Sequence, residues 1–287
     1  MDGPINDFGN KFWEQINSTN VNLQELIDNN FSPIVYGLGF KYDPLKDWLI
    51  FKGNFSSNYR VPTLNDLYWA QGGNQYLNPE KGWSSEMGIV LNSGMKTKAM
   101  EGYGFMSESS YSITTFINQT QNWIQWIPTE FGYWSPKNVK QIENKGVEAK
   151  VEWNRSSKRT KIQAKLFYTY THSRNKEFLI QNDERANRIP IYIPTHKANT
   201  YLSYSRRRLT FFYSQIYNGR VYIDESNSSY LPHYFPANTG ISYFNVFKNL
   251  NYKIAGRINN LYNEPYQVVA NRPIPGRNYS LNVTLKF

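Results

Sequence analysis

The side chains most able to bind a ligand gather in two stretches that the sequence places in loops. The first, "NQTQNWIQWIPTEFGYWSP", carries four candidate binding residues: Trp123, Trp126, Tyr133 and Trp134. Exposed aromatic rings on a loop favour contact with a ligand of apolar or π character. The second, "NDERANRIP", adds Arg185 and Arg188, which suit an anionic ligand. Packing between loops, an aromatic belt at a membrane surface and plain solvation of the arginines are the alternatives.

Other chemistry finds little support in the residues. The chain has no cysteine, and His172, His196 and His233 lack the spacing of a metal-ligand set, so no metal or other cofactor is expected. No GxSxG, P-loop or HExxH motif is present. The net charge of +10 is scattered along the chain, which argues against a nucleic-acid partner. The sequence therefore predicts a protein that is not an enzyme.

The composition indicates how such loops are supported. Of 287 residues, 17% are aromatic, yet the mean hydropathy is −0.64. Strands that are apolar on one face only, with many Tyr and Trp at the interfaces, give this combination in membrane barrels. No apolar run approaches the roughly 18 residues of a spanning helix. This excludes a helical membrane protein and leaves a barrel open.

Period-two alternation is the main structural signal. In the final "NYSLNVTLKF", Tyr279, Leu281 and Val283 point one way and polar residues point the other. The polar row of "VEAKVEW" and "KIQAKLFYTYT" is mixed in charge and is assigned to the lumen, because a Lys or Arg facing lipid at the midplane costs about 2–4 kcal/mol. This row comprises Glu148, Lys150, Glu152, Lys161, Gln163 and Lys165, and Phe167 is the one exception.

About eleven strands follow from this pattern. They are predicted at 33–42, 47–60, 84–93, 99–117, 139–154, 160–172, 196–205, 208–217, 238–247, 250–261 and 278–287. Short turns alternate with long connections at 61–83, 118–138, 173–195, 218–237 and 262–277. Short periplasmic turns and long extracellular loops are typical of outer-membrane barrels. The predicted fold class is therefore all-β, a transmembrane antiparallel β-barrel.

The segment "SSNYRVPTLNDLYW" contains a turn motif after the second strand. Pro62 removes a backbone donor and ends strand pairing. We expect Leu64, Leu67 and Tyr68 to fold back as an apolar cluster, and Arg60 to hydrogen-bond loop carbonyls. The motif is interpreted as a structural brace.

Three pieces of the chain, in order, resemble the barrel of TonB-dependent outer-membrane receptors. They are the motif just described with "NQYLNPEKGWSSEMGIVL", the glycine-led "NKGVEAKVEW", and "INNLYNEPYQVVANRPIPGRNYSLNVTLKF", which ends in Phe287. The resemblance spans 33–287. It implies the C-terminal half of a 22-stranded barrel at 33–287, with the plug domain absent and an extracellular-loop remnant at 1–32.

The resemblance also implies a function and partners. A complete receptor would import a scarce nutrient, such as a ferric siderophore, cobalamin or an oligosaccharide, across the outer membrane of a Gram-negative bacterium. Expected partners are outer-membrane lipid and lipopolysaccharide, the missing plug and N-terminal barrel half, and the barrel-assembly machinery through the C-terminal strand. The TonB system would be reached only through the missing part.

Several alternatives remain open at this point. A small plug-less pore or adhesin would need direct pairing of 33–42 with 278–287. A non-functional truncated remnant is a second alternative. An outer-membrane enzyme, the third, would need a converging Ser, His and acid.

Overall fold

The computed structural model describes residues 33–96, 105–176, 188–248 and 250–286. The chain divides into two compact units, Met1–Val35 and Tyr36–Phe287, and the fold below is that of the second unit. The predicted loop remnant at 1–32, Arg185 and Phe287 lie outside the described residues.

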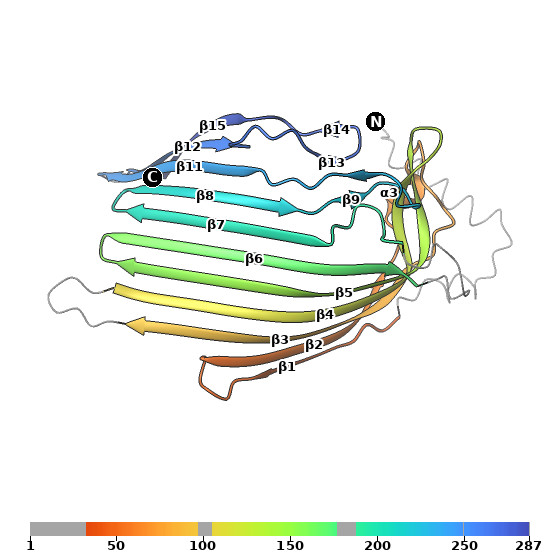
Figure 1. The fold of residues 1–287 in the computed structure, drawn as a ribbon, viewed down its shortest axis with the longest axis horizontal. Helices are drawn as coiled ribbons and strands as arrows, with labels where there is room; N and C mark the ends of the chain where they lie inside the picture. The colour runs from red at the N-terminus through yellow and green to blue at the C-terminus, as the bar shows by residue number, and fades with distance from the viewer. Residues whose placement is uncertain (1–32, 97–104, 177–187, 249, 287) are drawn as a thin grey trace, which may run out of the picture. The chain divides into compact units, whose positions relative to one another are not determined.

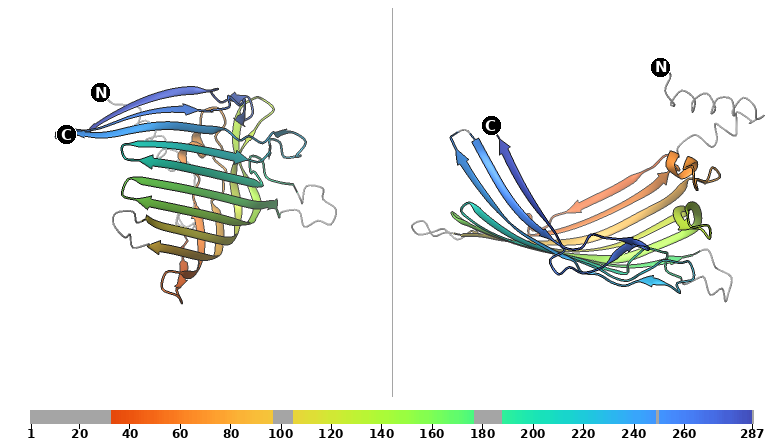
Figure 2. Two further views of the ribbon diagram at one scale, coloured as in Figure 1. Left: turned by 60° about the vertical axis from the view of Figure 1, so that its left-hand side comes forward. Right: turned by 90° about the horizontal axis from the view of Figure 1, so that it is seen from above.

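One antiparallel sheet of eleven strands dominates the second unit (Figure 1). Its strands, in spatial order, are β1 (Gly37–Tyr42), β2 (Leu49–Arg60), β3 (Glu80–Lys96), β4 (Phe105–Pro128), β5 (Trp134–Ser157), β6 (Thr160–Asn175), β7 (His196–Arg206), β8 (Leu209–Asn218), β11 (Ala237–Phe247), β12 (Leu250–Asn259) and β15 (Asn278–Lys286). Each predicted strand corresponds to one of these, so the all-β prediction is confirmed. The sheet is strongly curved when seen from above (Figure 2).

Smaller elements occupy the long connections. They are the helix α3 (Leu64–Tyr68), the pair β9 (Val221–Tyr222) and β10 (Tyr230–Leu231), and the pair β13 (Gln267–Val269) and β14 (Arg272–Pro273). We call the end of the sheet that carries them the loop end, and the opposite end the short-turn end. Across the described part of the chain, no helix has the length and apolar character needed to cross a membrane.

The strand register sorts the side chains onto two faces. Val151 of β5 lies opposite Tyr111 of β4 and Leu166 of β6, so apolar residues meet across neighbouring strands. These side chains are exposed rather than packed in a core, and Tyr279, Leu281 and Val283 are 71%, 72% and 60% exposed. A sheet face this apolar and this open fits a lipid environment, as predicted.

The opposite face is polar. Lys150 and Lys165 both pair with Glu152, at 2.8 and 3.0 Å. Phe167, the apolar exception, lies beneath the Lys150 ammonium, 5.4 Å from ring centroid to Nζ. Lys150, Glu152 and Lys165 of the mixed row predicted for the lumen therefore form a connected network on one face.

The two outer strands leave their far edges unpaired in the described structure. β1 pairs with β2 alone, and β15 pairs with β12 alone. Pairing between 33–42 and 278–287, which a small closed barrel requires, is therefore not formed by the described residues.

The connection predicted at 118–138 is wrong. β4 and β5 each contain 24 residues and continue through this region to a tight turn at 129–133. At about 3.3 Å per residue each strand is about 80 Å long, far more than a bilayer requires. The outer part of this hairpin therefore projects beyond the other strands at the loop end (Figure 1).

Candidate functional site

A cluster of charged side chains forms at the loop end, where β2 stops. The Arg60 guanidinium forms a bidentate ion pair with the Glu80 carboxylate. Its Nε donates to Oε2 at 2.8 Å, and its Nη2 donates to Oε1. Arg60 also lies 3.6 Å from Asp66. Glu80 accepts a further bond from the backbone N–H of Ile124, at 2.7 Å. One bidentate ion pair thus ties β2 and β3 to the base of the projecting hairpin.

Asp66 is the buried centre of helix α3. Thr63 caps the helix: its hydroxyl accepts from the Asp66 N–H at 3.1 Å, while the Asp66 carboxylate accepts from the Thr63 N–H at 2.9 Å. This reciprocal arrangement is a capping box. The remaining carboxylate oxygen accepts a bond from the indole Nε1 of Trp126 at 2.9 Å. Asp66 therefore joins the turn motif to the hairpin.

The charge on Asp66 is stabilised despite its burial. Burial by itself raises the pKa of this carboxyl, and the bonds from Thr63 and Trp126, with the nearby Arg60 charge, act in the opposite direction. The net effect is a pKa below the ordinary Asp value. The carboxylate stays ionised and can accept all of its bonds at neutral pH.

The turn motif is a brace, but it works differently from our prediction. Leu64 is 78% exposed and Tyr68 is 47% exposed, so the expected apolar cluster does not form. Arg60 binds carboxylates rather than loop carbonyls. The spacing of Thr63 and Asp66 was the sequence signal that would have identified the capping box.

Amide side chains fix the hairpin to the segment after α3. Asn138 donates to the carbonyl of Asn78 at 3.0 Å and accepts from its N–H at 2.8 Å. Asn74 donates to the carbonyl of Pro136 at 3.1 Å. Asn122 sits at a φ of 54° and donates to the carbonyl of Pro79. The hairpin is thereby held in one orientation next to α3.

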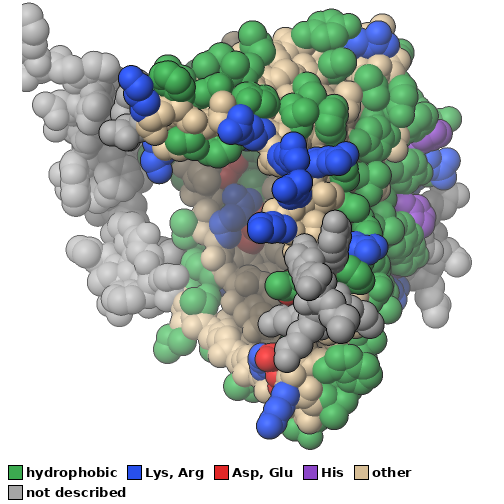
Figure 3. All heavy atoms as spheres, turned by 90° about the vertical axis from the view of Figure 1, so that its left-hand side faces the viewer, with side chains coloured by type: hydrophobic (Ala, Val, Ile, Leu, Met, Phe, Trp, Pro, Cys, Tyr) green, Lys and Arg blue, Asp and Glu red, His purple; other side chains and the backbone are tan. Residues whose placement is uncertain are grey.

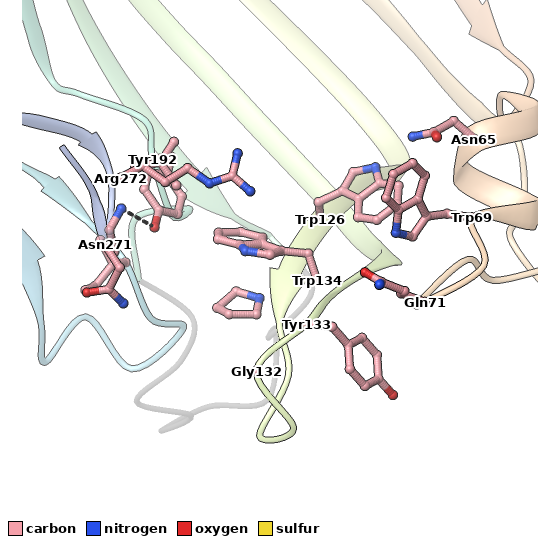
Figure 4. A pocket seen from close by; sticks show the side chains of 14 residues that line it. Asn65, Trp69, Gln71, Trp126, Gly132, Tyr133, Trp134, Tyr192, Asn271 and Arg272 are labelled. Carbon is pink, nitrogen blue, oxygen red and sulfur yellow. Dashed lines mark hydrogen bonds between the residues drawn. The ribbon is translucent and has the colours of Figure 1, made fainter. Parts of the chain in front are cut away.

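A cavity of about 880 Å³ opens between this hairpin, α3 and the β13–β14 loop (Figure 4). It is lined by Asn65, Trp69, Gln71, Trp126, Pro128, Gly132, Tyr133, Trp134, Tyr192, Ile223, Val269, Ala270, Asn271 and Arg272. Volumes of roughly 300–1,000 Å³ with aromatic walls and a few polar groups are typical of small-molecule sites.

Three predicted binding residues meet in this cavity. Trp126 and Trp134 project into it, and Tyr133 stands at its edge near the hairpin turn (Figure 4). Trp123 does not line it, because an odd step along β4 places it on the other face of the strand. All three tryptophans lie on strands, so the expectation that they sit on a loop is wrong.

Of the two predicted arginines, Arg185 lies outside the described residues and Arg188 does not line the cavity. Arg188 points a guanidinium nitrogen at the Glu225 carbonyl, 3.5 Å away, and is not among the lining residues. Next to it, Asn227 holds the backbone of Ile189 through bonds of 2.8 and 2.9 Å. The cation that does line the cavity is Arg272, which the sequence pattern did not single out.

Tyr192 is the central residue that sequence reasoning missed. Its backbone has a φ of 59°, a conformation that is strained for a bulky side chain. Its N–H donates to Tyr222, its hydroxyl accepts from the Ala270 N–H at 3.4 Å, and its ring lies 5.9 Å from that of Trp134. Strain held in place by several contacts is often found at ligand sites.

No metal centre was found among the described residues. The three histidines are exposed, and this part of the chain contains no group of three or more His, Cys, Asp or Glu residues able to hold an ion. The chemical groups that the cavity offers to a ligand are therefore aromatic rings, amides and a guanidinium.

Comparison with known proteins identifies the fold. A family model described as TonB dependent receptor-like, beta-barrel matches residues 10–261. The chain is 26% identical over 238 residues to the vitamin B12 transporter BtuB of Photobacterium profundum, covering 82% of this chain and 35% of that protein. It is 30% identical over 114 residues to BtuB of Vibrio vulnificus, covering 39% and 16%. The chain thus spans about a third of the first relative's length.

Solved structures share the architecture. The copper transporter OprC matches with a TM-score of 0.60 at 16% identity, over 86% of this chain and 39% of that one. The siderophore receptor PiuA from Acinetobacter baumannii matches with a TM-score of 0.59 at 20% identity, over 87% and 35%. At these identities the likeness establishes the fold alone. Together with the family match, the open antiparallel sheet shows that the chain belongs to the TonB-dependent receptor family and is a barrel portion of such a receptor; the relatives named above are transporters and receptors rather than enzymes.

Proposed function

We propose that this chain forms the C-terminal half of the barrel of an outer-membrane receptor, and that its loop end captures a scarce nutrient for import. The observation that carries the proposal is the cavity bounded by Trp126, Trp134, Tyr192 and Arg272. The plug, the other strands of a 22-stranded barrel and the contact with TonB would come from outside this chain.

The cavity chemistry favours a bulky ligand with flat or conjugated parts. The ring faces of Trp134 and Tyr192 offer stacking surfaces, and they are tilted by 47° to one another. Arg272 brings a positive charge to the same space, and Asn271 and Gln71 bring amide groups. A metal chelate such as a ferric siderophore or cobalamin combines these features. The similarity to vitamin B12 transporters gives cobalamin additional support.

The test is ligand binding by the receptor that carries this chain, folded in detergent or bilayer. Cyanocobalamin and a panel of ferric siderophores would be titrated while tryptophan fluorescence is followed. Replacing Trp134 by Ala should weaken binding of the accepted ligand by about tenfold or more, as expected for an aromatic anchor. Arg272→Gln should weaken binding of anionic ligands more than of neutral ones.

The matched control is Trp123→Ala, since Trp123 lies in the same β4–β5 hairpin as Trp134 but does not line the cavity. Its affinity should equal that of the wild type. Equal ligand affinities of the Trp134 and Trp123 variants would mean that the ligand does not bind in the cavity.

A further inference from the structure

The short-turn end carries a row of cations from three hairpin turns. We call it the cationic edge, and it consists of Lys158, Arg159, Arg206, Arg207, Arg208 and Lys248. All six side chains are exposed. Figure 3, which faces this end, shows Lys and Arg side chains gathered beside the hydrophobic surface, with few acidic side chains near them.

Backbone bonds hold these turns together. The N–H of Arg207 donates to the carbonyl of Arg159 at 2.8 Å, which joins the β5–β6 and β7–β8 turns. The N–H of Phe244 donates to the carbonyl of Arg208 at 2.9 Å, which joins the second turn to β11. The fold therefore fixes like charges next to one another, an arrangement that costs free energy unless an anion lies close by.

No member of the edge forms an ion pair with a described carboxylate. The backbone conformation of the turns also indicates that these cations serve a purpose other than forming the turn. Arg207 and Lys248 have φ values of 54° and 52°, where Gly or Asn would be less strained. Long cationic side chains thus occupy positions where the backbone alone favours other residues.

The edge lies where the apolar face ends. Along β7, Leu202, Tyr204 and Arg206 follow one another on the same face at steps of two, and the first two are exposed apolar residues of the lipid-facing side. Tyr204 pairs with Phe211 of β8, which is also exposed. A cation one step beyond this apolar stripe reaches the level of lipid headgroups.

We propose that the cationic edge binds the phosphates of anionic phospholipids in the leaflet at the short-turn end, and so anchors the barrel at that depth. Each Lys or Arg near an anionic lipid surface contributes about 1 kcal/mol, so several together give a clear preference over zwitterionic lipid. The inference depends on the membrane position of the sheet and not on the ligand of the cavity.

The test uses the full receptor folded into vesicles of equal parts phosphatidylglycerol and phosphatidylcholine. After mild extraction, bound lipid would be counted by native mass spectrometry. The triple variant R206Q/R207Q/R208Q should retain at least about tenfold less phosphatidylglycerol relative to phosphatidylcholine than wild type, since each cation contributes about fivefold. Salt at about 1 M should bring wild type toward the variant, because it shortens the Debye length to about 3 Å.

Two further variants make the result decisive. The variant R206K/R207K/R208K keeps the charge and should retain the lipid, which separates charge loss from misfolding. The variant K81Q/K137Q/K197Q removes three exposed cations elsewhere and should behave as wild type. Unchanged phosphatidylglycerol retention by the Gln triple variant overturns the proposal. If that variant instead loses binding to soluble polyglutamate while its lipid retention is unchanged, the edge belongs to an acidic protein segment.

Discussion

The indole of Trp126 donates a 2.9 Å hydrogen bond to the buried carboxylate of Asp66, sixty residues earlier in the chain. This bond joins a five-residue helix to a projecting hairpin and closes one side of the cavity. A bond from a neutral donor to a charged acceptor contributes about 1.5–3 kcal/mol. The outer hairpin is therefore held by a contact that single substitutions can probe.

Replacing Trp126 by Phe should loosen the outer hairpin without unfolding the sheet. An aromatic ring is kept, although a smaller one, and the donor to Asp66 is lost, so the opening free energy of the hairpin should fall by about 1.5–3 kcal/mol. Hydrogen exchange of the amides near the 129–133 turn would measure this. Trp123→Phe, on the other face of β4, should leave exchange unchanged.

Acidification should release the same contact. The pKa of Asp66 is lowered on folding, so its contribution to stability is fully present above the ordinary Asp value near 3.9 and is lost as pH falls through the lowered folded value. Hydrogen exchange and tryptophan fluorescence recorded from pH 7 downward should show the hairpin loosening in that acidic range. Asp66→Asn should be loosened already at pH 7 and show no such pH dependence.

Arg60 and Glu80 should couple energetically. Arg60→Lys keeps the charge but loses the two-point grip on Glu80. Because the Arg60 side chain is 44% exposed, we expect a coupling free energy of only about 1 kcal/mol. A double-mutant cycle with Glu80→Gln, read by urea unfolding, would give it. A coupling near zero would mean that Glu80 acts through Ile124 alone.

Gly146 should not tolerate a side chain. A Cβ there would lie 2.0 Å from the Tyr170 carbonyl oxygen and 2.7 Å from the Phe116 ring. Gly146→Ala should therefore destabilise the β4–β5–β6 region by about 1–3 kcal/mol, measured by urea unfolding. Gly256→Ala is the control, since a Cβ at that position meets nothing within 4 Å. Equal stability of the two variants would contradict the packing described.

An arginine should be far more costly at position 166 than at position 167. Leu166 lies on the apolar face, whereas Phe167 lies beside Lys150 on the polar face. Leu166→Arg should cost about 2–4 kcal/mol in a bilayer if it lies near the midplane, and Phe167→Arg should cost much less. Folding equilibria in vesicles would compare them, and similar costs would argue against the assignment of the faces.

The sequence predicted the sheet well because the apolar residues of paired strands must lie on the same face of the sheet. Val147 and Val151 of β5 and Leu166 of β6 alternate with polar residues, and a one-residue slip between the two strands would turn the apolar residues of one strand to the polar face. The outer hairpin escaped prediction because Trp123, Ile124 and Trp126 place apolar groups on both faces and erase period two. On one of those faces Ile124 is buried and Trp126 bonds to Asp66, so that face packs against the protein rather than lipid.

The cavity could not be predicted in the same way. Trp134, Tyr192 and Arg272 are distant in sequence and meet only where the β4–β5 hairpin packs beside two separate connections. The left-handed backbone of Tyr192 has no signal in the residue type, since Tyr rarely adopts it. By contrast, the spacing of Thr63 and Asp66 was readable as a capping box, and only the burial of Asp66 required the structure.

The odd number of strands restricts what can meet the free edges of the sheet. Every neighbouring pair is antiparallel, so β1 and β15 run in the same direction. A second copy standing the same way up in the bilayer would therefore offer each edge a parallel neighbour. Closing the ring with antiparallel contacts throughout takes an odd number of additional strands, with both outermost ones running opposite to β1 and β15.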